Sequence, residues 1–324
     1  MPESTSQSAF SQNASHQDLL PGDLLLTKGS ARALLRPVAG GRICSLQLAA
    51  ADGSLQEVLY PYTAAGVDAL RWAKGGIYPL VPYSNRIAHS RLSTPDGVVA
   101  LAPHPDAAPH TLHGNAHGLP WQVQEHAAAQ AVMVLDSPAS PAWPWHYRVT
   151  QRVHLRDDAL TLELCLHNED TRAMPTGLGF HPYFCHSPQA RVGFHASTWW
   201  DRSEDFLALA ARPVGPEEGF APARALPPGT RTDYFGGWDG RAELELPGGT
   251  TLYLQGDGPL SHLVLHRPPQ PLYLCLEPVT HVADAFNLAA QGQADTGTVL
   301  LAPGESFSAS LTISLRARSM TAGE

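Results

Sequence analysis

Four stretches of the sequence place ionisable or amide side chains among glycines, prolines and aromatic residues. They are YPLVPYSNRIAHSRL (78–92), TLHGNAHGLPW (111–121), GLGFHPYF (177–184) and PLYLCLEPVTHVADAFN (271–287). The chain has 16 histidines, so a histidine by itself says little. The neighbours of each candidate residue have to decide between chemistry and ordinary packing.

The third and fourth stretches hold the residue types needed for proton transfer. Pro182 favours an extended backbone at His181, and the aromatic residues around it would desolvate the imidazole and shift its pKa. Glu277 ends an alternating run in which Leu272, Leu274 and Leu276 share one face and Glu277 shares the other. A carboxylate at such a strand end suits a cleft. The alternatives are a histidine packed in the core and a carboxylate on the solvent-exposed rim.

The first two stretches offer groups that could hold a ligand. Asn85 and Arg86 lie in a loop, where a guanidinium can donate paired hydrogen bonds to ligand oxygens; pairing with a surface carboxylate is the alternative. His113 and His117 have the spacing of metal ligands on a helix, but Gly114, Gly118 and Pro120 argue against a helix here. We therefore expect a loop that presents His113 to a polar ligand. Trp121 is either an apolar wall for a sugar ring or a core residue.

Alternating apolar and polar residues dominate the rest of the chain. ALTLELCLHN (159–168) and SFSASLTISLRA (306–317) predict strands with one apolar face, and RAELELPGGTTLYLQ (241–255) predicts a hairpin. AAGVDALRW (64–72) predicts one or two helical turns, and the proline-rich residues 212–230 predict a long surface loop. The fold class expected is all-β: one large, mostly antiparallel β-sandwich domain over residues 21–319, between a flexible tail at 1–20 and a short one at 320–324.

Composition narrows the range of partners. The net charge of −9 without a basic run argues against nucleic acid and anionic membranes. The first twenty residues lack the features of a signal peptide, and no apolar stretch is long enough to span a membrane. Cys44, Cys165, Cys185 and Cys275 are widely spaced, which predicts free thiols in the cytoplasm. Without an HExxH or paired-carboxylate motif we expect no metal, and activity that survives EDTA.

Taken in order, these stretches resemble the aldose 1-epimerase, or galactose mutarotase-like, family. The resemblance rests on PLVPYSNRI, LHGNAHGLPW, GLGFHPYF, TDYFGGWDG, LEP and LAPGES, spread over residues 22–317. It implies the β-sandwich known as a supersandwich and a site for a free sugar on its concave face. Two departures, LHGN with a second histidine at His117 and FHPYFCH around His181, point away from a strict galactose enzyme.

The resemblance also assigns roles. It implies that His181 is the general acid and Glu277 the general base. His113 would bond the sugar near its ring oxygen, and Arg86 would contact the substrate. Asp233 would hold sugar hydroxyls, although Asp239 lies close to it in the sequence. Asn85, Trp121 and Tyr183 complete the expected binding residues.

Interconversion of the α and β anomers needs only these two proton carriers. A base takes the proton of the C1 hydroxyl, an acid protonates the ring oxygen, and the ring recloses after rotation. No electron reaches a carrier, so we expect no cofactor. Each group contributes typically ~10²–10⁴-fold, and ordinary pKa values of ~6.5 for His and ~4.3 for Glu would suit the roles.

Three other functions remain open, of which the weakest is a glycosidase with two carboxylates, because Glu277 has no carboxylate partner in a comparable motif. A hexose-6-phosphate epimerase would need a cationic pocket for phosphate, and Arg71, Lys74 and Arg91 do not form a convincing cluster in sequence. A non-catalytic carbohydrate-binding protein would not need both proton carriers. The oligomeric state is not predicted.

Overall fold

The computed structural model describes residues 19–68, 70–71, 73–186, 190–247, 249–269 and 272–316. The predicted tails therefore lie outside the described residues, except for Leu19 and Leu20. Within the described chain, no helix has the length and apolar character needed to cross a membrane.

Strands make up most of the described chain, and the helical segments are short. The strands are β1 (Leu24–Lys28), β2 (Ala31–Arg36), β3 (Arg42–Ala49), β4 (Leu55–Glu57), β5 (Ile77–Leu80), β6 (Arg86–Ile87), β7 (Arg91–Thr94), β8 (Gly97–Ala100), β9 (Thr111–Leu112), β10 (Gln122–Ala127), β11 (Gln130–Ser137), β12 (Tyr147–Leu155), β13 (Ala159–Asn168), β14 (Met174–Thr176), β15 (Gly179–Pro182), β16 (Phe184–Cys185), β17 (Arg191–Arg202), β18 (Ala208–Pro213), β19 (Phe220–Ala225), β20 (Arg231–Glu245), β21 (Thr251–Asp257), β22 (His262–Arg267), β23 (Tyr273–Val279), β24 (Val299–Leu301) and β25 (Ser306–Arg316). The helical segments are η1 (Pro37–Ala39), η2 (Ala88–Ser90), η3 (Ala116–Gly118) and α1 (Ala285–Ala290).

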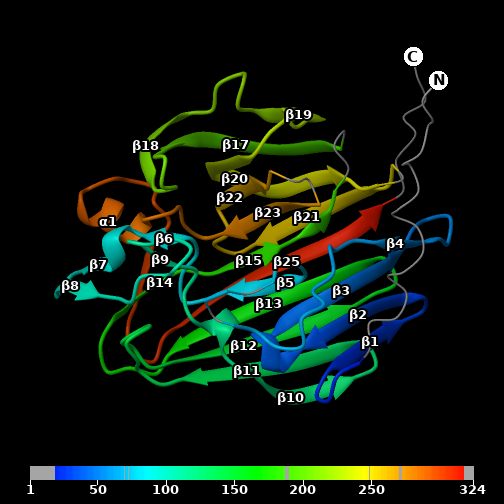
Figure 1. The fold of residues 1–324 in the computed structure, drawn as a ribbon, viewed down its shortest axis with the longest axis horizontal. Coiled ribbons are helices and arrows are strands. Elements are labelled where there is room, and N and C mark those ends of the chain that lie inside the picture. Colours follow the sequence, from blue (N-terminus) through cyan, green and yellow to red (C-terminus); the bar gives the residue numbers. More distant parts are fainter. Residues whose placement is uncertain are drawn as a thin grey trace, which may run out of the picture.

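Nineteen strands join in one large sheet whose ladders are antiparallel. Pairing runs from β10 through β11, β12, β13, β25 and β21 to β20. It continues through β22, β23, β15, β5, β3 and β2 to β1 (Figure 1). The chain therefore forms the all-β, antiparallel architecture that the alternating pattern predicts.

Several predicted strands are confirmed residue by residue. Leu160, Leu162, Leu164 and Leu166 of β13 are all buried in the main core. The predicted hairpin is the pair β20–β21, with Arg241 opposite Gln255. These strands form because one face of each buries its apolar side chains while the polar residues alternate outward.

Two local predictions are wrong. The described residues of 64–72 form bends and turns rather than helix, because a short apolar run does not outweigh glycine and the lack of caps. The stretch 212–230 contains β19, whose Arg224 pairs with Val192 of β17. Proline did not prevent this strand, because Pro222 is not among the residues that β19 pairs with β17.

Candidate active site

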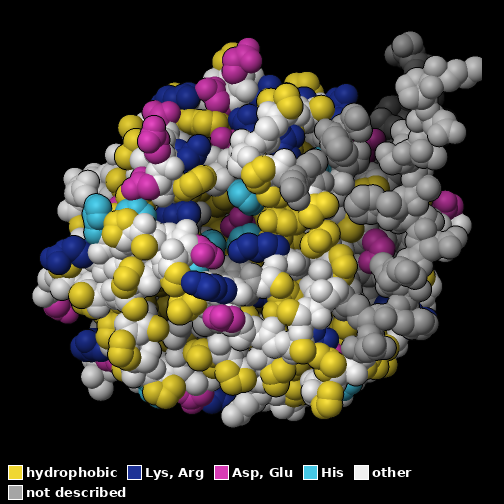
Figure 2. All heavy atoms as spheres, viewed as in Figure 1, with side chains coloured by type: hydrophobic (Ala, Val, Ile, Leu, Met, Phe, Trp, Pro, Cys, Tyr) yellow, Lys and Arg dark blue, Asp and Glu magenta, His cyan; other side chains and the backbone are white. Residues whose placement is uncertain are grey.

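Two adjacent strands bring the predicted acid and base together. On β15 and β23, Gly179 lies opposite Val279, and the same register continues to Phe184 of β16 opposite Leu274. This antiparallel register places His181 opposite Glu277 on one face of the sheet. The leucines of β23 enter the main core on the other face, as the alternation predicts. Figure 2 shows that the surface is hollowed near the centre of this face, where His, basic and acidic side chains gather.

The two side chains approach each other closely in a buried position. His181 Nε2 lies 3.5 Å from Glu277 Oε1, and the residues are 6% and 3% exposed. Among the described residues, neither Glu277 Oε2 nor His181 Nδ1 has a hydrogen-bond partner. A buried carboxyl oxygen without a partner is unfavourable, so a ligand hydroxyl would find a hydrogen-bond partner here.

Burial shifts both pKa values away from the ordinary ones expected from sequence. It raises the pKa of Glu277 to about 8, against an opposing effect of the Arg86 charge. Burial lowers the pKa of His181 well below its usual value, and the nearby His266, Lys74, Arg42 and His117 lower it further. Near neutral pH, the proton therefore resides mainly on the carboxyl group and the imidazole is neutral.

Aromatic rings hold the imidazole of His181. Its ring stacks on Tyr183 at 4.7 Å and 12° between planes, and Tyr78 lies 4.7 Å away on the neighbouring strand β5. Arg42, which is fully buried, lies with its Cζ 4.5 Å from the Tyr78 ring and 4.3 Å from the Tyr62 ring. The contacts with Tyr183 and Tyr78 fix the ring plane of His181, whose Nδ1 is buried.

A backbone contact determines the tautomer of His113. The Asn85 N–H donates to His113 Nδ1 at 3.0 Å, and the His113 N–H donates back to the Asn85 carbonyl at 2.9 Å. Burial lowers the pKa of His113 well below its usual value, so the neutral ring carries its proton on Nε2. Its ring lies 5.2 Å from that of His181. Asn85 therefore positions His113 as a hydrogen-bond donor beside the acid–base pair.

Arg86 brings a cation to the same region. Its charge lowers the pKa of Glu277, and its guanidinium lies 4.8 Å from the Phe206 ring. No hydrogen-bond partner for its buried Nε occurs among the described residues. Arg86 can therefore offer a donor to a ligand that enters beside Glu277.

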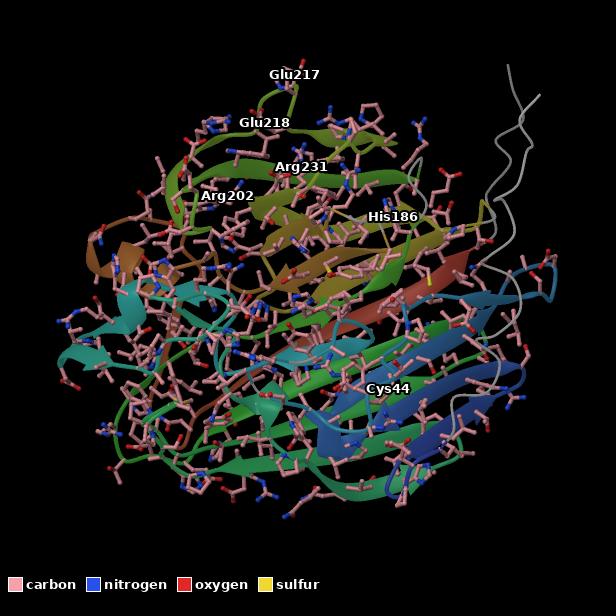
Figure 3. All side chains as sticks on the ribbon, in the orientation of Figure 1. Cys44, His186, Arg202, Glu217, Glu218 and Arg231 are labelled. Carbon is pink, nitrogen blue, oxygen red and sulfur yellow. The ribbon has the colours of Figure 1, made fainter. Side chains whose placement is uncertain are left out.

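The structure does not bring Asp233 or Asp239 to the pair. In the β20–β22–β23 register, Asp233 lies opposite Leu265 and Leu276, whereas Glu277 shares its face with Val264 and Tyr234. Asp233 therefore points to the other face of the sheet, where it accepts a hydrogen bond from Arg231, at the start of β20 (Figure 3).

Asp239 lies elsewhere. It is exposed and lines a surface groove of about 790 Å³ together with Arg241, Glu243 and Tyr253. Neither His181 nor Glu277 lines that groove.

Trp121 is a core residue in the structure. It is 3% exposed, and its indole N–H donates to the Ala116 carbonyl at 3.0 Å. A Cβ on Gly41 would lie only 2.9 Å from its ring, so the glycine allows close packing. In the structure Trp121 therefore packs in the core, and it does not form an apolar wall for a sugar ring.

Sequence reasoning missed several residues of the site. Tyr78 and Arg42 come from strands β5 and β3, and Thr232 bonds His266, which lies opposite Cys275. Only the alternation of β23 signalled that Cys275 shares the face of Glu277.

Among the described residues, one set of three side chains could hold a metal ion: His181, Cys275 and Glu277, with one ligand atom from each within 4.8 Å of the others.

The fold and site together define a large antiparallel β-sandwich with a buried imidazole–carboxylate pair at its sheet surface. The chain belongs to the aldose 1-epimerase family, whose model matches residues 23–314. This is a family of isomerases that act on sugars.

Individual relatives share the sequence or the fold of this chain. The chain is 30% identical to the uncharacterized protein YphB of Escherichia coli (strain K12) over 73% of this chain and 82% of that protein. A solved structure from Escherichia coli K12, provisionally described as an aldose 1-epimerase, has a TM-score of 0.80 and 27% identity, covering 91% of this chain and 98% of the other. A galactose mutarotase-like protein from Clostridium acetobutylicum shares the fold at a TM-score of 0.76 and 17% identity, covering 90% and 94%.

Proposed function

We propose that this protein is an aldose 1-epimerase that interconverts the α and β anomers of a free monosaccharide, with His181 as acid and Glu277 as base. The observation that carries the proposal is the 3.5 Å between His181 Nε2 and Glu277 Oε1. The C1 hydroxyl and the ring oxygen are bonded to the same carbon. The acid and the base must therefore lie within a few ångströms of each other, as these two atoms do.

The proposed step balances without a carrier. Glu277 takes the proton of the C1 hydroxyl while His181 Nε2 gives its proton to the ring oxygen. The bond between C1 and the ring oxygen breaks, and the open aldehyde rotates about C1–C2. The ring recloses with the two residues in reversed roles, so the enzyme returns to its starting protonation state after the return proton transfer.

The number of protons that His181 and Glu277 hold together near neutral pH suits this step. The reaction needs one proton on the pair in either direction, and a pKa of about 8 for Glu277 with a low pKa for His181 provides that count around neutral pH. A bound sugar whose hydroxyl bonds the carboxylate would favour moving this proton to His181. The singly protonated pair is therefore the active form in this proposal.

Neighbouring residues would orient the sugar. His113 offers its Nε2–H to a ring or C1 oxygen, and Arg86 offers donors to a hydroxyl near Glu277. Tyr183 supports the imidazole by stacking, and Asn85 acts through His113. Asp233 and Trp121 have no role in this proposal, because the register and the core place them away from the pair.

The test is to follow freshly dissolved α-anomers of a sugar panel by polarimetry or NMR. At least one sugar should equilibrate faster with the wild-type protein than in buffer, and Glu277→Gln should remove the acceleration while the circular dichroism spectrum stays unchanged. If no sugar is accelerated, the proposal fails. Sugar binding without acceleration would favour a non-catalytic carbohydrate-binding protein instead.

A phosphorylated hexose is the second candidate, and Lys74 is the observation that favours it. The charge of Lys74 lowers the pKa values of His113, His117 and His181, so its ammonium group lies near the pair. Neither Arg71 nor Arg91 is among the charged groups that most lower these pKa values. Comparing glucose with glucose-6-phosphate decides between the substrates: a preference for the phosphate that Lys74→Met abolishes would support the second.

A further inference from the structure

The acid–base pair has a third neighbour that the proposed reaction does not use. Cys275 lies two residues before Glu277 on the same face of β23, and its side chain is fully buried. One ligand atom each from Cys275, His181 and Glu277 lies within 4.8 Å of the others. An imidazole, a thiolate and a carboxylate are the ligands that zinc takes in proteins.

The distances fit a metal with little rearrangement. With metal–nitrogen and metal–oxygen bonds of ~2.1 Å, the edge of a tetrahedral site is about 3.4 Å. His181 Nε2 and Glu277 Oε1 are already 3.5 Å apart. The sulfur must approach by at most about 1.2 Å to complete a tetrahedral face, since the three ligand atoms lie within 4.8 Å of one another and an edge to sulfur is about 3.6 Å. Rotation of the Cys275 or Glu277 side chain covers such a distance.

The charges around these three side chains also permit a bound metal ion. The positive charge of Arg86 beside Glu277 disfavours the binding of a metal cation. The charges of Lys74 and Arg42 near His181 act in the same direction. A thiolate and a carboxylate, however, cancel the two charges of the metal, and a neutral buried complex avoids the desolvation cost of a lone carboxylate. Glu277 Oε2 has no hydrogen-bond partner in the part of the chain that the structure describes, which leaves the carboxylate able to turn toward a metal.

We propose that His181, Cys275 and Glu277 form a site for a thiophilic divalent cation such as Zn²⁺, and that the bound cation blocks the acid–base pair. The thiol and the carboxyl group of Glu277 each release a proton to solvent as their bonds to the metal form, and no electron is transferred. A water molecule would take the fourth position of the tetrahedral site. The binding part stands on the geometry alone, and the inhibition part rests on the proposed epimerase function.

Cobalt(II) provides a direct test, because its absorption reports both geometry and sulfur ligation. Chelator-treated protein is titrated with Co²⁺. We expect visible bands of tetrahedral cobalt together with a near-ultraviolet band from thiolate-to-cobalt charge transfer. Cys275→Ser and Cys275→Ala should lose the charge-transfer band. The matched control is Cys44→Ser: Cys44 is also fully buried, but it lies on β3, away from β23 (Figure 3), and its removal should leave the band intact.

Zn²⁺ titration of the sugar reaction tests the inhibition. Wild type and Cys44→Ser should be inhibited by Zn²⁺ and recover in EDTA, whereas Cys275→Ser, compared with its own metal-free rate, should need at least about tenfold more Zn²⁺. The proposal is overturned if wild type gives no charge-transfer band, or if Cys275→Ser keeps the band or the Zn²⁺ sensitivity. If no sugar is epimerised, the proposed function fails, yet the cobalt titration still decides the metal site.

Discussion

Replacing Glu277 with glutamine should make the folded chain more stable in alkaline solution while abolishing its activity. Glutamine keeps the size of the side chain and cannot ionise. Burial raises the pKa of Glu277 from 4.5 to about 8, so the wild-type chain has to ionise a buried group as the pH rises. The variant escapes this cost.

The size of this difference in the free energy of unfolding follows from the linkage between proton binding and folding. Because the folded pKa lies above the unfolded one, the stabilising contribution of the protonated carboxyl is complete below about pH 4.5 and is lost as the pH rises through about 8. At ~1.4 kcal/mol for each factor of ten, the loss between about pH 5.5 and about pH 9 is on the order of 3 kcal/mol. Glu277→Gln should therefore gain about 3 kcal/mol over wild type across this interval.

The assay is urea unfolding, followed by tryptophan fluorescence, at both pH values. Glu163→Gln is the matched control, because Glu163 is an exposed carboxylate of β13 and its replacement should leave the pH dependence of wild type unchanged. A difference between Glu277→Gln and wild type that stays constant with pH would refute the reasoning, since the carboxyl would then not hold its proton in the folded chain.

Four further predictions concern activity and packing. His181→Asn should lower kcat by ~10²–10⁴-fold without unfolding the chain, measured by polarimetry and circular dichroism. For chelator-treated wild type, kcat/KM should be level around neutral pH and fall as Glu277 loses its proton above about pH 8; a continued rise would contradict the singly protonated pair. Asp233→Asn should leave kcat/KM unchanged, because Asp233 points to the other face of the sheet. A large increase in KM would instead show that Asp233 contacts the sugar. Trp121→Phe should lower stability by about 1–3 kcal/mol, because it loses the indole hydrogen bond to the Ala116 carbonyl and leaves a cavity beside Gly41, with KM unchanged, as shown by urea unfolding and sugar titration.

The sequence alone determined the strands and the types of group at the site. The alternation in 159–168 and 271–279 reflects a local rule, because each residue of a strand points away from its neighbour. The leucine face of β23 and the opposite face of Glu277 therefore follow without knowledge of the partner strands. The ordered motifs likewise indicated His181 and Glu277 as the candidate pair.

The tertiary structure decided what depends on neighbours distant in sequence. The register between β15 and β23 places His181 opposite Glu277, and the register of β20 turns Asp233 away. Burial then shifts both pKa values, an effect of desolvation that no sequence spacing expresses. The position of Cys275 beside the pair arises in the same way, because side chains from two strands meet only when the sheet forms.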